Sequence, residues 1–105
     1  MNERPSLTIS EKDVQMILSE HYQTFREIVE TNVYCHLCYS IGNPIGIRNY
    51  TIRLDDLNNI HLKGLCTQCG GPVARYIGYD EDPTIFARAE TFRKDNRSRF
   101  TLKKI

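Results

Sequence analysis

All four cysteines of the chain occur in two C-x-x-C segments, Cys35 with Cys38 and Cys66 with Cys69. A C-x-x-C segment on a tight turn directs both sulfur atoms toward one point, and two such segments together complete a tetrahedral site of four thiolates. The start of the chain has no apolar segment typical of a secretory signal, so we expect a cytoplasmic protein, in which disulfides are rare. The spacing therefore predicts one structural Zn2+ bound by the four cysteines. Iron in the same site is the alternative, because both metals accept this ligand set.

Four sulfur ligands leave no open position on the metal for water or substrate, so we expect the metal to stabilise the fold without catalysis. The site would carry a net negative charge, which the nearby bases Lys63 and Arg75 can offset, although solvated surface bases need no special role. The three histidines, His21, His36 and His61, belong to no recognisable acid–base or nucleophile pattern. The sequence therefore predicts no enzyme.

Between and after the cysteine pairs, apolar and polar residues alternate with a period of two, which is typical of strands. Three short strands are expected over residues 49–54, 60–63 and 73–77. Residues 55–59 are rich in turn formers and join the first two strands as a hairpin. This hairpin carries the chain away from the first cysteine pair and back to the second, so we expect it to bring the four ligands together.

The arrangement resembles the zinc ribbon family, in which two cysteine knuckles at turns are joined by a three-stranded antiparallel sheet. The resemblance covers residues 33–79 and is closest at the second knuckle, where Gly70 follows Cys69. A glycine there permits the positive φ that turns backbone N–H groups toward sulfur. The first knuckle differs from the family, because Tyr39 stands where glycine is commonest.

Two helices are expected on either side of the ribbon. Ser10 is a suitable N-cap, and apolar residues after it recur at helical spacing, which predicts one long amphipathic helix over about 11–30. Pro83 follows an acidic segment and predicts a shorter helix over about 83–95. The apolar stripe of the long helix is expected to pack within the chain, with a homodimer through residues 11–30 as the alternative.

Together these elements predict an α+β fold in one compact domain. Its parts are an N-terminal helical segment (1–32), the ribbon (33–79) and a short helix with a basic tail (80–105). An apolar content of 40% and a charged content of 26% are ordinary for a folded protein. No segment is long and apolar enough to predict a membrane span.

Charge is unevenly distributed, although the net charge is only +1. Residues 1–30 have an excess of acids, whereas residues 84–105 have an excess of bases interleaved with phenylalanines. Bases beside aromatic rings can hold phosphates and stack nucleobases. The candidate nucleic-acid-binding residues are Arg88, Arg93, Lys94, Arg97 and Arg99. The alternative is that Phe86 and Phe92 form helix core and the bases a solvated face.

The favoured function is a non-catalytic zinc module that binds a macromolecule, first a protein partner, as an adaptor or regulator. One alternative is a nucleic-acid-binding ribbon that uses the C-terminal bases, and another is a rubredoxin-like iron electron carrier. Tyrosines near the knuckles suit an interface or a thin core, and we favour the core. These tyrosines are Tyr34, Tyr39, Tyr50, Tyr76 and Tyr79.

Overall fold

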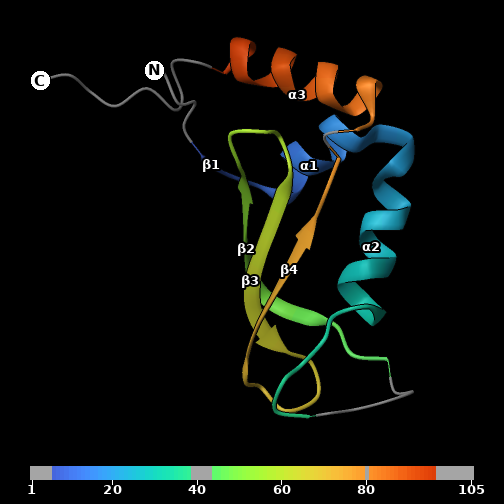
Figure 1. The fold of residues 1–105 in the computed structure, drawn as a ribbon, viewed down its shortest axis with the longest axis vertical. Helices are drawn as coiled ribbons and strands as arrows, with labels where there is room; N and C mark the ends of the chain where they lie inside the picture. Colours follow the sequence, from blue (N-terminus) through green and yellow to red (C-terminus); the bar gives the residue numbers. More distant parts are fainter. Residues whose placement is uncertain (1–5, 39–43, 80, 97–105) are drawn as a thin grey trace, which may run out of the picture.

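The computed structural model describes residues 6–38, 44–79 and 81–96. Its four-stranded antiparallel sheet has the order β1-β2-β3-β4, with β1 at Leu7–Ile9, β2 at Ile47–Leu54, β3 at Ile60–Cys66 and β4 at Pro72–Ile77. The helices are α1 at Glu11–Leu18, the 3-10 turn η1 at Ser19–His21, α2 at Tyr22–Thr31 and α3 at Pro83–Asp95. The α+β class is confirmed, as is the helix expected over residues 83–95 (Figure 1).

The sheet has four strands, so the prediction of three is wrong in number. The additional strand, β1, pairs with β2 and sets Leu7 opposite Leu54 and Ile9 opposite Ile52. Leu7 and Ile9 are buried while Thr8 between them is exposed. Three residues are too few to give a recognisable alternation, and the strand exists because a distant segment of the chain pairs with it.

The N-terminal helix begins where the sequence predicts but is not continuous. The Ser10 hydroxyl accepts a hydrogen bond from the Asp13 backbone N–H (3.1 Å), and the Asp13 carboxylate accepts one from the Ser10 N–H (2.9 Å). At Ser19 the backbone takes a φ of +49°, and η1 separates α1 from α2. The Arg88 guanidinium of α3 reaches the carbonyls of Ile17 and Leu18, where α1 ends. A partner from another helix therefore supports the break.

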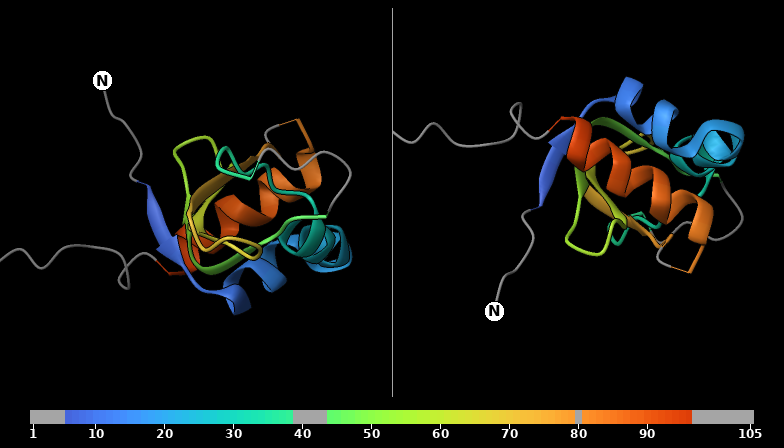
Figure 2. Two further views of the ribbon diagram at one scale, coloured as in Figure 1. Left: turned by 90° about the horizontal axis from the view of Figure 1, so that it is seen from below. Right: turned by 90° about the horizontal axis from the view of Figure 1, so that it is seen from above.

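The apolar stripe of the N-terminal helices packs within the chain. Val14, Ile17, Leu18, Phe25 and Val29 are all buried in one cluster with residues of the sheet and of α3. In Figure 2, α1 and α2 lie on one side of the strands, and α3 crosses the end of the sheet that carries the β2–β3 turn. A homodimer formed through this stripe would have to displace the core.

A polar network joins α1, α2 and β2. The Glu11 carboxylate accepts hydrogen bonds from the hydroxyls of Tyr22 (2.7 Å) and Tyr50 (2.6 Å) and from the Arg26 guanidinium (2.8 Å). Burial by itself raises the pKa of Glu11, but these three donors bring it below its usual value. Tyr50 thus links β2 to the N-terminal helices through its hydroxyl, and its ring is partly buried against the core.

The β2–β3 turn is attached to α3 by the buried Asn58 side chain and by Arg93. Asn58 is only 1% exposed, donates to the Glu90 carboxylate (2.8 Å) and accepts from Arg93 Nε (2.8 Å). The Arg93 guanidinium also donates to the Asp55 carbonyl. Asn58 has a φ of +67°, a conformation that asparagine tolerates better than most residues.

Asn58→Ala is expected to destabilise the protein by about 2–4 kcal/mol, because it removes the two hydrogen bonds of a buried side chain and puts alanine, which tolerates positive φ less well than asparagine, at this position. Chemical denaturation of the metal-loaded protein measures the loss. Asn58→Gly is the matched control, since it removes the same side chain but relieves the backbone, and it should be the milder change. An Asn58→Ala protein as stable as the parent would contradict a structural role for this cluster.

Among the described residues, no helix is both long and apolar enough to cross a membrane.

Candidate metal centre

The cysteines belong to the segment after α2, the end of β3 and the β3–β4 turn, and these segments lie at the end of the sheet opposite α3 (Figure 1). All four sulfur atoms lie within 4.8 Å of one another. Cys35 Sγ is 3.7 Å from Cys69 Sγ, and Cys38 Sγ is 3.8 Å from Cys66 Sγ. A tetrahedron with metal–sulfur bonds of about 2.3 Å has sulfur–sulfur edges of about 3.8 Å. The four residues predicted as ligands are thus together, at separations that suit one metal ion.

The second knuckle is formed at the end of β3. The backbone N–H groups of Gln68 and Cys69 point at Cys66 Sγ (3.3 and 3.4 Å), and that of Gly71 points at Cys69 Sγ (3.3 Å). Gly70 has a φ of +79°, as the sequence predicts. Hydrogen bonds of this kind orient metal ligands and stabilise thiolates, so the turn is prepared for a cation.

The first knuckle follows α2 and is held against the second by the segment that leads into β2. The Val33 N–H donates to the Ile45 carbonyl (2.8 Å), and the Gly46 N–H donates to Thr67 Oγ1 (3.0 Å). Gly46 is required here, because a Cβ at this position would lie 2.3 Å from the Val29 carbonyl oxygen at the end of α2. The knuckles are therefore joined by backbone contacts as well as by their sulfur atoms. Tyr39 lies outside the described residues.

The four thiols are electrostatically unequal. The backbone N–H of Cys69, together with that of Gln68, lowers the pKa of the Cys66 thiol to about 6. Burial and the hydrogen bonds of the neighbouring thiols raise the pKa of Cys38 to about 12. Cys66 is therefore the ligand that is ready as a thiolate near neutral pH, and a divalent cation would stabilise the others as thiolates.

The bases expected to offset the charge of the site lie elsewhere. Arg75 donates to the backbone carbonyls of Asn32 (3.0 Å) and Tyr76 (2.6 Å), and Lys63 is exposed on the outer face of the sheet. A base that the sequence did not indicate, Arg48, lies beside the second knuckle. Its guanidinium is 3.5 Å from the position that a Cβ on Gly70 would occupy. Arg48 is distant from the second knuckle in sequence and reaches it because β2 pairs with β3.

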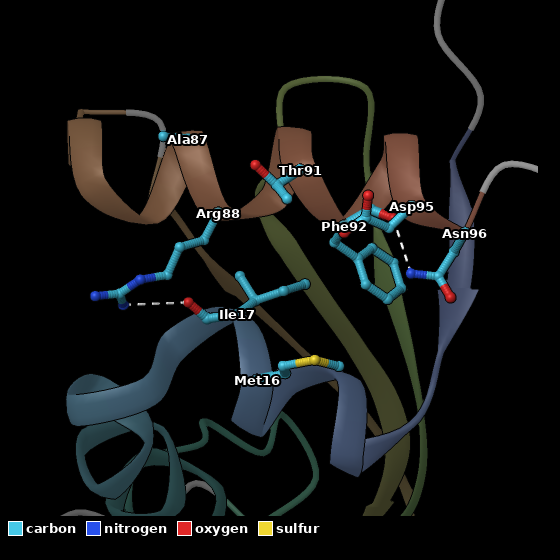
Figure 3. Close-up of a pocket in the computed structure, with 8 residues that line it drawn as sticks. All are labelled: Met16, Ile17, Ala87, Arg88, Thr91, Phe92, Asp95 and Asn96. Carbon is cyan, nitrogen blue, oxygen red and sulfur yellow. Dashed lines mark hydrogen bonds between the residues drawn. The ribbon is translucent and has the colours of Figure 1, made fainter.

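The C-terminal bases do not gather into one surface among the described residues. Arg88 donates to carbonyls of α1 and to the Glu20 carboxylate (3.1 Å), and Arg93 binds the β2–β3 turn. Figure 3 shows the Arg88 side chain directed at Ile17 and the Phe92 ring on the side of α3 that faces α1. Lys94 is exposed.

Arg97 and Arg99 lie outside the described residues, so nucleic-acid binding by the full set of C-terminal bases stays a prediction. Phe92 is buried and Phe86 is half-buried, as expected for helix core.

Two other groups of residues differ from their sequence interpretation. His61 Nε2 lies 2.7 Å from an Asp55 carboxylate oxygen, a pair that the sequence did not reveal. The same carboxylate accepts from the backbone N–H groups of Leu57 and Asn59, which agrees with its role in the turn. Among the tyrosines, Tyr50 and Tyr79 pack against the core, whereas two others are well exposed. These two are Tyr34 (67% exposed) and Tyr76 (51% exposed).

Comparison with known proteins identifies no relative of this chain. No protein-family model matches the chain, and neither a curated protein nor a solved structure matches it. The resemblance to zinc ribbons thus rests on the spacing of the cysteines and the geometry of their cluster. The chain is a compact α+β protein with a four-cysteine cluster suited to binding a metal ion.

Proposed function

We propose that the chain is a non-catalytic module in which one structural Zn2+, bound by Cys35, Cys38, Cys66 and Cys69, organises a surface for a macromolecular partner. The observation that carries the proposal is the cluster of four sulfur atoms, with separations of 3.7 and 3.8 Å across its two pairs. Four sulfur ligands complete a tetrahedron and leave no position for substrate, which is the arrangement of structural zinc sites.

The position of the cluster supports a structural role. It joins the segment that follows α2 to the end of β3 and the β3–β4 turn, which lie about 30 residues further along the chain. The four cysteines form no disulfide, so all four sulfur atoms are available as ligands. A metal ion there would stabilise the folded state directly.

Exposed apolar side chains beside the cluster support an adaptor that binds a protein. Tyr34 and Leu37 lie in or next to the first knuckle and are 67% and 62% exposed. Tyrosine is enriched at protein interfaces, where its ring supplies contact area and its hydroxyl a hydrogen bond. A metal that fixes the knuckle would also fix the direction in which these side chains are presented.

Metal analysis and visible absorption of the purified protein test the proposal, with mass determined by light scattering. We expect one zinc per chain and a colourless protein. A Cys66→Ser/Cys69→Ser variant should lose the metal, while His36→Ala, in the same knuckle as Cys35 but outside the cluster, should keep it. A red protein with one iron per chain, bleached by reductant, would overturn the zinc module and favour a rubredoxin-like electron carrier.

A further inference from the structure

The sheet has one face without a helix among the described residues, and its side chains form an ordered grid. Across the three long strands, Arg53 lies opposite His61 and His61 opposite Tyr76; in the next row, Thr51 lies opposite Lys63 and Lys63 opposite Ala74. The alternate residues, such as Ile52 and Leu62, point to the buried core. These outward side chains line a shallow hollow of about 280 Å³.

This outward face is positively charged. The strands β2, β3 and β4 contain no aspartate or glutamate, but Arg48, Arg53 and Lys63 occupy outward positions. Arg53 and Lys63 are exposed, and within the described parts of the chain neither makes an ion pair. The nearest acid, Asp55, is engaged by His61 and by backbone N–H groups.

The eleven acids of the described residues all lie outside β2, β3 and β4, and six of them are in the β2–β3 turn or in and beside α3. The other five belong to α1, η1 and α2, where only two bases offset them. These five acids are Glu11, Asp13, Glu20, Glu27 and Glu30, and the bases are Lys12 and Arg26. Because the charged residues within these three strands are all basic, their outward face attracts a partner of the opposite sign and suits an anionic occupant.

The aromatic ring of Tyr76, which its neighbours hold in place, lies on the same face as these bases. The Tyr76 ring lies along β4, with its Cε2 and hydroxyl 3.5 Å from the position of a Cβ on Gly78. The His61 ring meets it edge-on at a centroid distance of 4.9 Å and an interplanar angle of 68°, and Asp55 orients His61. Tyr76 is nonetheless 51% exposed, so its ring is fixed by its neighbours and still accessible.

We infer that the outward face of β2, β3 and β4 binds single-stranded nucleic acid, with Arg53 and Lys63 on phosphates and Tyr76 stacked on a base. Bases that track a backbone and an aromatic ring that stacks on nucleobases are the two elements of single-strand recognition. A shallow sheet face does not enter a duplex groove, so the strand must offer unstacked bases. An acidic peptide would satisfy Arg53 and Lys63 but would leave the Tyr76 ring without a stacking partner.

This site is separate from the C-terminal bases considered above. Arg88 and Arg93 are occupied by contacts within the fold, whereas Arg53 and Lys63 are directed outward from a rigid sheet. The inference adds a nucleic-acid surface to the proposed module and does not depend on which metal the cluster holds. A molecule with this face and the exposed first knuckle would bridge a nucleic acid and a protein.

Fluorescence anisotropy of the full-length, metal-loaded protein with labelled oligo(dT) and oligo(U) at low salt tests the inference. We expect binding that weakens steeply with salt. Arg53→Ala/Lys63→Ala should weaken affinity at least tenfold and reduce the slope of log affinity against log salt by about 1.4, since each lost phosphate contact removes about 0.7. Tyr76→Ala should weaken affinity by about 5- to 150-fold, and Tyr76→Phe should retain it.

The matched control is Lys12→Ala, which removes one positive charge from an exposed position on α1 and is compared with Lys63→Ala alone. It should bind as the parent does. Circular dichroism and metal content establish that each variant is folded, so that loss of binding and loss of the metal centre are separate results. The inference fails if neither oligonucleotide binds, or if Lys12→Ala weakens binding as much as Lys63→Ala does. It also fails if Tyr76→Ala binds like the parent and an acidic polypeptide displaces the oligonucleotide.

Discussion

Replacing Cys66 with serine is expected to abolish stoichiometric metal binding and to destabilise most of residues 33–79. Cys66 is fully buried, ends β3 and receives two backbone N–H groups on its sulfur. Structural zinc sites contribute about 10–16 kcal/mol of apparent binding free energy, which is comparable to the whole stability of a small domain. Loss of one ligand therefore costs a large share of the free energy that holds the knuckle end of the sheet.

Hydrogen exchange and thermal unfolding, with and without a strong chelator, measure this effect. Protection should be lost first at the two knuckles and in the adjoining parts of β2 and β3, and chelation of the parent should reproduce the change. His36→Ala is the matched control, because His36 is exposed in the same turn as Cys35 and Cys38 but is not one of the four clustered residues, and it should leave the metal content unchanged. A Cys66→Ser protein that retains one metal ion per chain, or melts with the parent, would contradict the assignment.

Phe25→Ala is expected to destabilise the protein by about 3–5 kcal/mol, the usual cost of truncating a fully buried phenylalanine. The Phe25 side chain is 0% exposed in the middle of α2, where its ring stacks on that of Tyr22 at a centroid distance of 5.8 Å. It fills the space between the N-terminal helices and the sheet, so its removal leaves a cavity that the surrounding strands cannot close.

Urea denaturation of the metal-loaded protein gives the loss in stability, and Gln23→Ala on the exposed side of the same helix is the control. Gln23→Ala should change stability by less than about 0.5 kcal/mol. Light scattering of the same samples also tests the homodimer considered from the sequence. If Phe25→Ala dissociated a dimer, or if its effect depended on protein concentration, the apolar stripe would be a subunit contact and its packing within one chain would be wrong.

Several features of this protein follow from the sequence because they depend on residues close together in the chain. The two C-x-x-C segments identify the four ligands, and the glycine after Cys69 indicates the positive φ found at Gly70. Ser10 and Pro83 mark helix starts through capping and a fixed φ, which are properties of a few consecutive residues. Alternation of apolar residues gives the three long strands.

Other features depended on partners that the sequence does not reveal. The strand β1 has only three residues and forms because β2 lies beside it, and the helix break at Ser19 is supported by Arg88 of α3. The same contact makes Arg88 a structural residue, whereas the sequence offered a phosphate contact or a solvated base as the alternatives.

The difference between these two groups of features has a physical reason. Caps, turns and ligand spacing are set by covalent geometry over a few residues, so the sequence by itself determined the metal cluster and most of the secondary structure. Whether a base faces solvent or binds a carbonyl is decided by segments that meet only after folding. The tertiary structure alone therefore engaged Arg93 with the β2–β3 turn and left Arg53 and Lys63 on the open face of the sheet.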